Sequence, residues 1–158
     1  MNIRDHLETI GAELDSTARL FGYEGVGEEF SMTAEETEDI YRITWTRGEK
    51  AFTLVTPIPE EDPAGLHRRR AARRLCKNAL YALCREVTGI HPPWGSLTGV
   101  RPTHLMLEAL GEGLSETKAE ERLIRVYDVM PDKARLLREI AAVQRGMKAP
   151  SDDEIDVY

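Results

Sequence analysis

The fold is decided by two stretches, Ile40-Tyr-Arg-Ile-Thr-Trp-Thr46 and Ala51-Phe-Thr-Leu-Val-Thr56, which Arg47-Gly-Glu-Lys50 joins. Both are rich in β-branched and aromatic residues that alternate with polar ones, as in strands with one buried face. The short link contains a glycine and predicts an antiparallel β-hairpin. Because an isolated hairpin is not stable in water, we expect its apolar face, with Trp45 in the core, to cover a helix.

The first 22 residues predict that helix. Their apolar residues recur every three or four positions, at Ile3, Leu7, Ile10, Leu14, Ala18 and Phe21, which is the period of one helix face. We expect the helix to end at Gly22 and the hairpin to pack on it. The segment from Gly25 to Phe30 is interpreted as a loop. Its glycines do not indicate a phosphate site, because the acidic neighbours would repel a phosphate.

The chain after the hairpin predicts helices. Pro57, Pro59 and Pro63 alternate with acidic residues and indicate an extended connector. Helices are expected over 66–87, 103–110, 116–127 and 132–147, with Pro102 and Pro131 in first turns and Ser115 as an N-cap. The predicted fold class is α+β, in which an N-terminal helix and a small antiparallel hairpin sheet precede a mainly helical bundle of about four helices.

We expect three parts along the chain. Residues 1–63 form a small α/β subdomain with the hairpin, residues 64–147 a helical subdomain, and residues 148–158 a linker. The linker ends on Ile155, Val157 and Tyr158, which alternate as at the start of a strand. Because no partner strand is evident, we expect this polypeptide to be the N-terminal piece of something longer.

Composition and charge exclude several classes of protein. The chain has 158 residues, 28 acidic and 21 basic side chains, a net charge of −7 and two cysteines. Two cysteines are too few for a disulfide framework, a four-cysteine zinc site or a three-cysteine iron–sulfur site. The sequence contains no run of 18 apolar residues and no basic-then-apolar leader. We therefore expect a cytoplasmic protein that does not bind a membrane.

The predicted helix 66–87 is basic. Residues 64–85 carry seven Lys or Arg and no Asp or Glu, so the rest of the chain carries −14. Its expected buried stripe is Ala72, Cys76, Ala79, Leu80, Leu83 and Val87, with both cysteines as small buried hydrophobes. On the opposite side we expect Arg70, Arg74, Lys77, Tyr81 and Arg85, joined by Arg68 and Arg69. These cations either are neutralised by acidic segments of the same protein and by solvent, or meet an anionic ligand or partner.

The segment from Pro92 to His104 is the densest signal in the sequence. Two prolines and two glycines predict a rigidly shaped turn, which Trp94 is expected to anchor. Arg101 stands just before Pro102 at a helix start, where free N–H groups favour an anion. Arg101 is therefore a candidate for holding a carboxylate. The alternative is that Arg101 and Trp94 only join helices or contact a neighbouring domain.

No catalytic residues are evident in this chain. His6, His67, His91 and His104 lack the spacing of metal ligands on one helix face, and we interpret them as surface or loop residues. There is no Gly-x-Ser-x-Gly nucleophile motif and no distinct carboxylate pair. We expect no metal and no cofactor in this chain.

Parts of the sequence resemble the N-terminal region of bacterial oxygen-independent coproporphyrinogen III oxidase-like proteins of the Z type, also called coproporphyrinogen dehydrogenases. The resemblance rests on Leu80-Tyr81, Thr88-Gly89 and above all Pro93-Trp-Gly-Ser-Leu-Thr-Gly-Val-Arg-Pro102. It continues through Tyr127, the Pro131-Asp-Lys-Ala134 helix start and Ile140-Ala141, and so covers approximately residues 64–158. His104 departs from the Arg-Pro-x-Lys pattern of that family.

The resemblance implies a radical-SAM protein of heme biosynthesis. In that family, a Cys-x-x-x-Cys-x-x-Cys motif after this region binds an iron–sulfur cluster and S-adenosylmethionine. The reaction implied for the full-length protein is oxidative decarboxylation of propionate side chains on coproporphyrinogen III or a related tetrapyrrole. The resemblance also implies that the linker 148–158 leads to a catalytic domain missing from this polypeptide, and both cofactors are expected in that domain.

Three hypotheses follow for the chain itself. The first is an accessory domain that packs on its own C-terminal radical-SAM domain and helps to seat an anionic tetrapyrrole with Trp94, Arg101, Arg70, Arg74 and Lys77. The second is a non-catalytic RNA- or protein-binding module that uses the basic helix 66–87. The scarcity of stacking aromatics on that face disfavours nucleic acid. The third is a surface for assembly, including homodimerisation.

Overall fold

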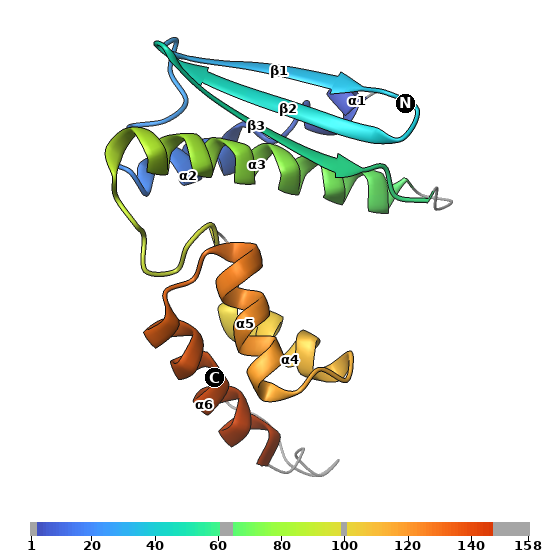
Figure 1. Ribbon diagram of the computed structural model, residues 1–158, viewed down its shortest axis with the longest axis vertical. Coiled ribbons are helices and arrows are strands. Elements are labelled where there is room, and N and C mark those ends of the chain that lie inside the picture. Colours follow the sequence, from blue (N-terminus) through green and yellow to red (C-terminus); the bar gives the residue numbers. More distant parts are fainter. Residues whose placement is uncertain (1–2, 61–64, 99–100, 147–158) are drawn as a thin grey trace, which may run out of the picture. The chain divides into compact units, whose positions relative to one another are not determined.

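The computed structural model describes residues 3–60, 65–98 and 101–146. The chain divides into two compact units, Met1–Pro92 (unit 1) and Pro93–Tyr158 (unit 2). Unit 1 contains a sheet and three helices, and unit 2 contains three helices (Figure 1). The α+β class predicted from the sequence is confirmed.

The sheet of unit 1 has three antiparallel strands in the order β1 (Phe30–Glu36), β2 (Ile40–Arg47) and β3 (Lys50–Pro57). The predicted hairpin is β2 and β3, whose register pairs Ile43 with Leu54. The two residues between the paired Arg47 and Lys50 form the turn, and Gly48 has the positive φ of 56° that such a turn requires. The predicted pairing of these strands is therefore confirmed.

Strand β1 was not expected from the sequence. It pairs with β2 along its length, for instance Ala34 with Ile43. Its inner positions are occupied by Phe30, Met32 and Ala34, of which Phe30 is buried and Met32 is 36% exposed. Its other positions are polar, so the strand lacks a strong apolar alternation. The sheet consequently has one strand more than the hairpin predicted.

The predicted N-terminal helix is two helices, α1 (Ile3–Leu7) and α2 (Gly11–Arg19). The chain turns between them, where the Ile10 N–H donates to the Leu7 carbonyl at 3.2 Å. All six residues of the predicted apolar stripe are nevertheless buried. The periodicity therefore predicted correctly which residues enter the core, although not the break in the helix.

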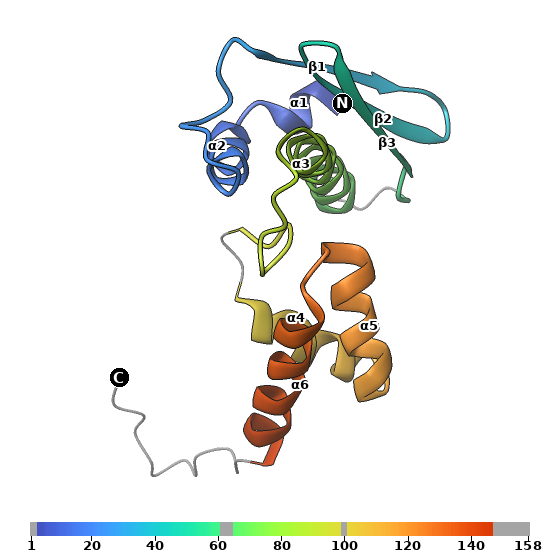
Figure 2. The ribbon, with the colours of Figure 1, turned by 60° about the vertical axis from the view of Figure 1, so that its left-hand side comes forward.

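The long helix α3 (Leu66–Thr88) covers the inner face of the sheet (Figure 1). The helix that covers the hairpin is therefore α3 and not the predicted N-terminal helix. Helices α1 and α2 pack beside α3 (Figure 2). The Trp45 indole N–H donates to the Cys76 carbonyl at 3.1 Å, which joins β2 to α3 inside the core. Trp45 is a core residue as predicted, being 3% exposed.

Two predictions about the surface of unit 1 are wrong. Tyr81 was placed on the cationic side of α3, but it is buried and makes an edge-on contact with Phe21, with ring centroids 5.2 Å apart. His6 was interpreted as a surface residue, but it is 3% exposed and neither ring nitrogen has a hydrogen-bond partner. Both residues are buried because α1 and α2 pack against α3.

Unit 2 consists of α4 (Pro102–Gly111), α5 (Glu116–Tyr127) and α6 (Pro131–Gly146) (Figure 2). The predicted limits agree with these bounds to within one or two residues. Pro102 lies in the first turn of α4, and the Ser115 hydroxyl accepts a hydrogen bond from the Lys118 N–H at 3.3 Å, as an N-cap does. A core around Met106, Leu123 and Leu137 holds the three helices together.

The compact units differ from the subdomains expected from the sequence. The division falls between Pro92 and Pro93 and not near residue 63, because α3 buries its apolar stripe against the sheet. Of the four helices expected in the bundle, α3 therefore belongs to unit 1. The linker 148–158 and its strand-like end lie outside the described residues. No helix in the described ranges is long and apolar enough to cross a membrane.

Candidate functional site

The loop that begins unit 2 is held against the turn between α5 and α6. The Ser96 N–H donates to the Tyr127 carbonyl at 2.8 Å, and the Met130 N–H donates to the Pro93 carbonyl at 3.1 Å. Gly95 has a φ of 58°, and a Cβ atom there would lie 1.9 Å from the Tyr127 carbonyl oxygen. Only glycine fits this approach, so the loop and the turn form one rigid piece.

Trp94 projects from this loop and is 36% exposed. The Lys133 ammonium lies 5.8 Å from the centroid of its ring, within the range of a cation–π contact. Backbone hydrogen bonds hold the loop in place, and the anchoring role of Trp94 stays a prediction. The exposed part of the indole is available to a ligand or another protein surface.

Arg101 is the N-cap residue of α4 and is exposed, with an extended backbone (φ −77°, ψ 107°). The first turn of α4 contains no acidic residue, and no side chain caps it. Within the described ranges, no ion pair involves Arg101. A guanidinium and an uncompensated helix N-terminus thus occur together, which favours an anion.

Two pairs of cations on α3 differ in their surroundings. Lys77 and Arg73 both approach Glu13 of α2, with N–O distances of 3.8 and 3.6 Å, and Arg73 also donates to the Thr9 hydroxyl at 2.8 Å. These two side chains are therefore neutralised by an acidic residue of the same protein, which is one of the two alternatives expected from the sequence. The sequence carried a signal that was missed, because Glu13 lies on the exposed side of the predicted N-terminal helix, next to its apolar stripe.

Arg70 and Arg74 form the other pair. They are exposed, and in the part of the chain that the structure describes neither makes an ion pair. They are four residues apart on one helix, which places them on the same face about 6 Å apart at Cβ. Two neighbouring guanidinium groups can bind one carboxylate together or two carboxylates separately.

The predicted site residues are divided between the two units. Arg70, Arg74 and Lys77 belong to unit 1, whereas Trp94 and Arg101 belong to unit 2. Each unit therefore offers its own cationic group: the Arg70–Arg74 pair on α3, and Arg101 at the start of α4.

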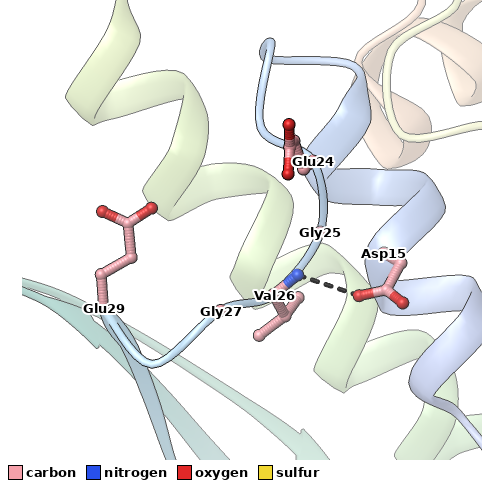
Figure 3. Close-up of a pocket in the computed structure, with 6 residues that line it drawn as sticks. All are labelled: Asp15, Glu24, Gly25, Val26, Gly27 and Glu29. Atoms are coloured by element: carbon pink, nitrogen blue, oxygen red, sulfur yellow. Dashed lines mark hydrogen bonds between the residues drawn. The ribbon is translucent and has the colours of Figure 1, made fainter.

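A pocket of about 370 Å³, which the sequence did not predict, lies beside the Gly25–Gly27 loop (Figure 3). Carboxylates of Asp15, Glu24 and Glu29 line it. The Val26 N–H already donates to Asp15 Oδ1 at 2.9 Å, so this loop amide is not available to a phosphate. The predicted loop is confirmed as far as Glu29, and Phe30 begins β1. Among the described residues, no group of three His, Cys, Asp or Glu could hold a metal ion.

Comparison with known proteins gives one informative relative. This chain is similar to HemZ of Bacillus subtilis (strain 168). That protein is described as an oxygen-independent coproporphyrinogen-III oxidase-like protein. The two are 38% identical over 76 residues, which cover 45% of this chain and 15% of HemZ. No family model matches the chain, and no solved structure matches it. The similarity to HemZ supports the family resemblance that the sequence motif indicated.

Both cysteines of the chain are buried in the core of unit 1. Burial raises the pKa of the Cys76 thiol from 9.0 to about 12 and that of Cys84 to about 11. The Cys76 sulfur lies 3.3 Å from the Met32 sulfur within the core. Both cysteines therefore act as small buried hydrophobes, as predicted.

Proposed function

We propose that this chain is the N-terminal part of a longer coproporphyrinogen-III oxidase-like protein of heme biosynthesis. The observation that carries the proposal is the similarity to HemZ over 76 residues, which are only 15% of that relative. The activity, its iron–sulfur cluster and its S-adenosylmethionine would belong to a catalytic domain that follows in the chain. A cytoplasmic location is part of the same proposal.

The role proposed for these two units is to pack on the catalytic domain and to help seat the substrate. Coproporphyrinogen carries four carboxylates, and the described surface offers cations without an internal partner at Arg101, Arg70 and Arg74. Arg101 is the strongest of these, because its guanidinium would act with the N-terminus of α4 on the same carboxylate. Trp94 would supply an apolar surface next to the ring system. Lys77 would contribute least, because Glu13 already partly neutralises it.

Within this proposal the chain binds and orients, and it takes no part in bond-making. A carboxylate held by Arg101 would fix the position of one propionate relative to the catalytic domain. A charged hydrogen bond of this kind contributes about 1.5–3 kcal/mol, or roughly 10- to 150-fold in affinity. Binding of the substrate, and not the chemical step, should therefore depend on Arg101.

The test uses the full-length protein. In Arg101→Ala we expect KM for coproporphyrinogen III to rise by about 10-fold or more while kcat changes much less. Arg101→Lys should recover part of the loss, since it retains the charge but not the bidentate geometry. The matched control is Arg125→Ala, which removes another exposed cation of unit 2 and should leave both constants unchanged. Unchanged turnover and affinity in Arg101→Ala would refute the seating role.

The alternative of an RNA- or protein-binding module on helix 66–87 is less well supported. Tyr81 would have been the stacking aromatic among the cations, but it is buried against Phe21. Arg70 and Arg74 remain available to an acidic partner. RNA retention that falls steeply with salt would favour this alternative, because each phosphate contact releases counterions.

A further inference from the structure

An apolar surface of unit 2 extends along α6. It consists of Trp94, Lys133, Leu136, Ile140 and Val143, which we call the α6 face. The four helical residues are three or four positions apart and so lie on one side of α6, next to the stripe of buried residues Ala134, Leu137 and Ala141. Leu136 is 41% exposed and Val143 is 62% exposed. The contact between Lys133 and the Trp94 ring joins the loop to the beginning of this face.

The size of the α6 face restricts what can cover it. With Trp94 36% exposed as well, the apolar side chains present on the order of 300 Å² to solvent. Stable interfaces between separate proteins bury about 800 Å² on each partner. The face alone is thus too small to hold a second copy of the chain. It is large enough for a partner that is kept nearby by a covalent tether, because a tether raises the effective concentration to about the millimolar range.

We infer that the α6 face is the surface on which unit 2 contacts the catalytic domain of the longer protein. The inference rests on the proposed function, in which such a domain follows. Helix α6 is the last element that the structure describes, and residues 147–158 come directly after it. In the proposed longer protein, a domain that follows α6 in the chain is tethered to it covalently, which raises its effective concentration near the α6 face. The matching surface should be apolar, with an acidic group near Lys133.

The test measures how accessible the α6 face is in the two lengths of chain. A Val143→Cys variant is made in the 158-residue chain and in the full-length protein, and its rate of modification by a maleimide is followed by peptide mass spectrometry. The change is tolerable because Val143 is mostly exposed. The matched control is Val126→Cys on α5, which is 46% exposed and lies outside the face.

We expect modification of Val143→Cys to slow by about tenfold or more in the full-length protein, with Val126→Cys changing less than about twofold. Equal rates for Val143→Cys in both chains would overturn the inference. Slowing in the 158-residue chain as its concentration is raised would assign the face to a second copy instead.

A separate assay of the full-length protein tests the proposed function itself. If the full-length protein binds an iron–sulfur cluster and oxidises coproporphyrinogen III but leaves Val143→Cys reactive, only the inference about the surface fails. If the full-length protein lacks that activity and still protects the face, the proposed function fails and a tethered partner remains. A reading frame without a further domain overturns both.

Discussion

Gly95 is the residue on which the shape of the loop before α4 depends. In Gly95→Ala the new Cβ would meet backbone atoms of Tyr127 and Asp128, the nearest at 1.9 Å, in addition to the strain of a positive φ. We expect the free energy of unfolding of unit 2 to fall by about 3 kcal/mol or more. Urea denaturation followed by circular dichroism measures the loss.

Gly113 provides the matched control for this prediction. Its φ is +87°, but a Cβ there would have no atom within 4 Å. Gly113→Ala therefore reports the backbone strain alone, about 1 kcal/mol. Equal losses in Gly95→Ala and Gly113→Ala would show that the loop is not docked as described.

The two thiols give a pH dependence with a definite sign. The pKa values of Cys76 and Cys84 are raised from 9.0 to about 12 and about 11 in the folded protein, mainly by burial. Above pH 9.0 the unfolded chain loses these protons first. The contribution of each thiol to stability is therefore complete below that pH and is lost as the pH rises toward the folded value.

The measurement is the urea midpoint between about pH 8 and pH 10.5, compared with that of the double variant Cys76→Ala/Cys84→Ala. The natural chain should lose stability more steeply than the variant as the pH rises, because only the natural chain contains the two thiols. The contributions of tyrosine and lysine are the same in both chains and cancel in the comparison. A thiol reagent should also leave the folded chain unmodified at about pH 8. Rapid modification of either cysteine in the folded protein would contradict their burial.

At the scale of single elements, helix α5 shows how a local signal predicts a boundary. Ser115 caps the helix through its hydrogen bond from the Lys118 N–H. Ser115→Ala should cost unit 2 about 1 kcal/mol, whereas Ser115→Asp should retain the stability because aspartate is an equally good N-cap. Thermal unfolding by calorimetry distinguishes the two. An equal loss in both variants would mean that the hydroxyl does not act as a cap.

Other elements could not be predicted because their signal is not local. Strand β1 contains Glu35 and Glu36 and few strong strand formers, and it is specified by pairing with β2. The break between α1 and α2 leaves the apolar period intact, so the pattern gave no warning of it. The candidate site also contains features with and without a local signal. Arg101 and Trp94 belong to a dense local motif and could be predicted. The neutralisation of Lys77 by Glu13 could not, because it depends on how α2 packs against α3.

At the scale of the whole molecule, the described residues form two hydrophobic cores, one in each unit, and these cores share none of those residues. We therefore expect a fragment of residues 1–92 to fold alone, with a mixed helix and strand spectrum and one cooperative thermal transition. The control is a fragment of residues 1–63, which contains the whole sheet but lacks α3. It should be unfolded, because nothing then covers the inner face of the sheet.

A folded 1–63 fragment would favour the boundary expected from the prolines and acidic residues of the connector. An unfolded 1–92 fragment would show instead that unit 1 depends on the rest of the chain. The sequence could not decide between these boundaries. The extended connector does separate two elements along the chain, but burial of the α3 stripe against the sheet joins them in space.

Each unit also carries one of the two tryptophans of the chain. Trp45 is enclosed in the core of unit 1, whereas Trp94 is partly open to water at the surface of unit 2. The first should emit at shorter wavelength and be shielded from iodide, and the second should emit at longer wavelength and be quenched. Replacing either one with phenylalanine would leave a built-in optical reporter for the other unit, so ligand binding and unfolding could be followed in each unit without an added dye.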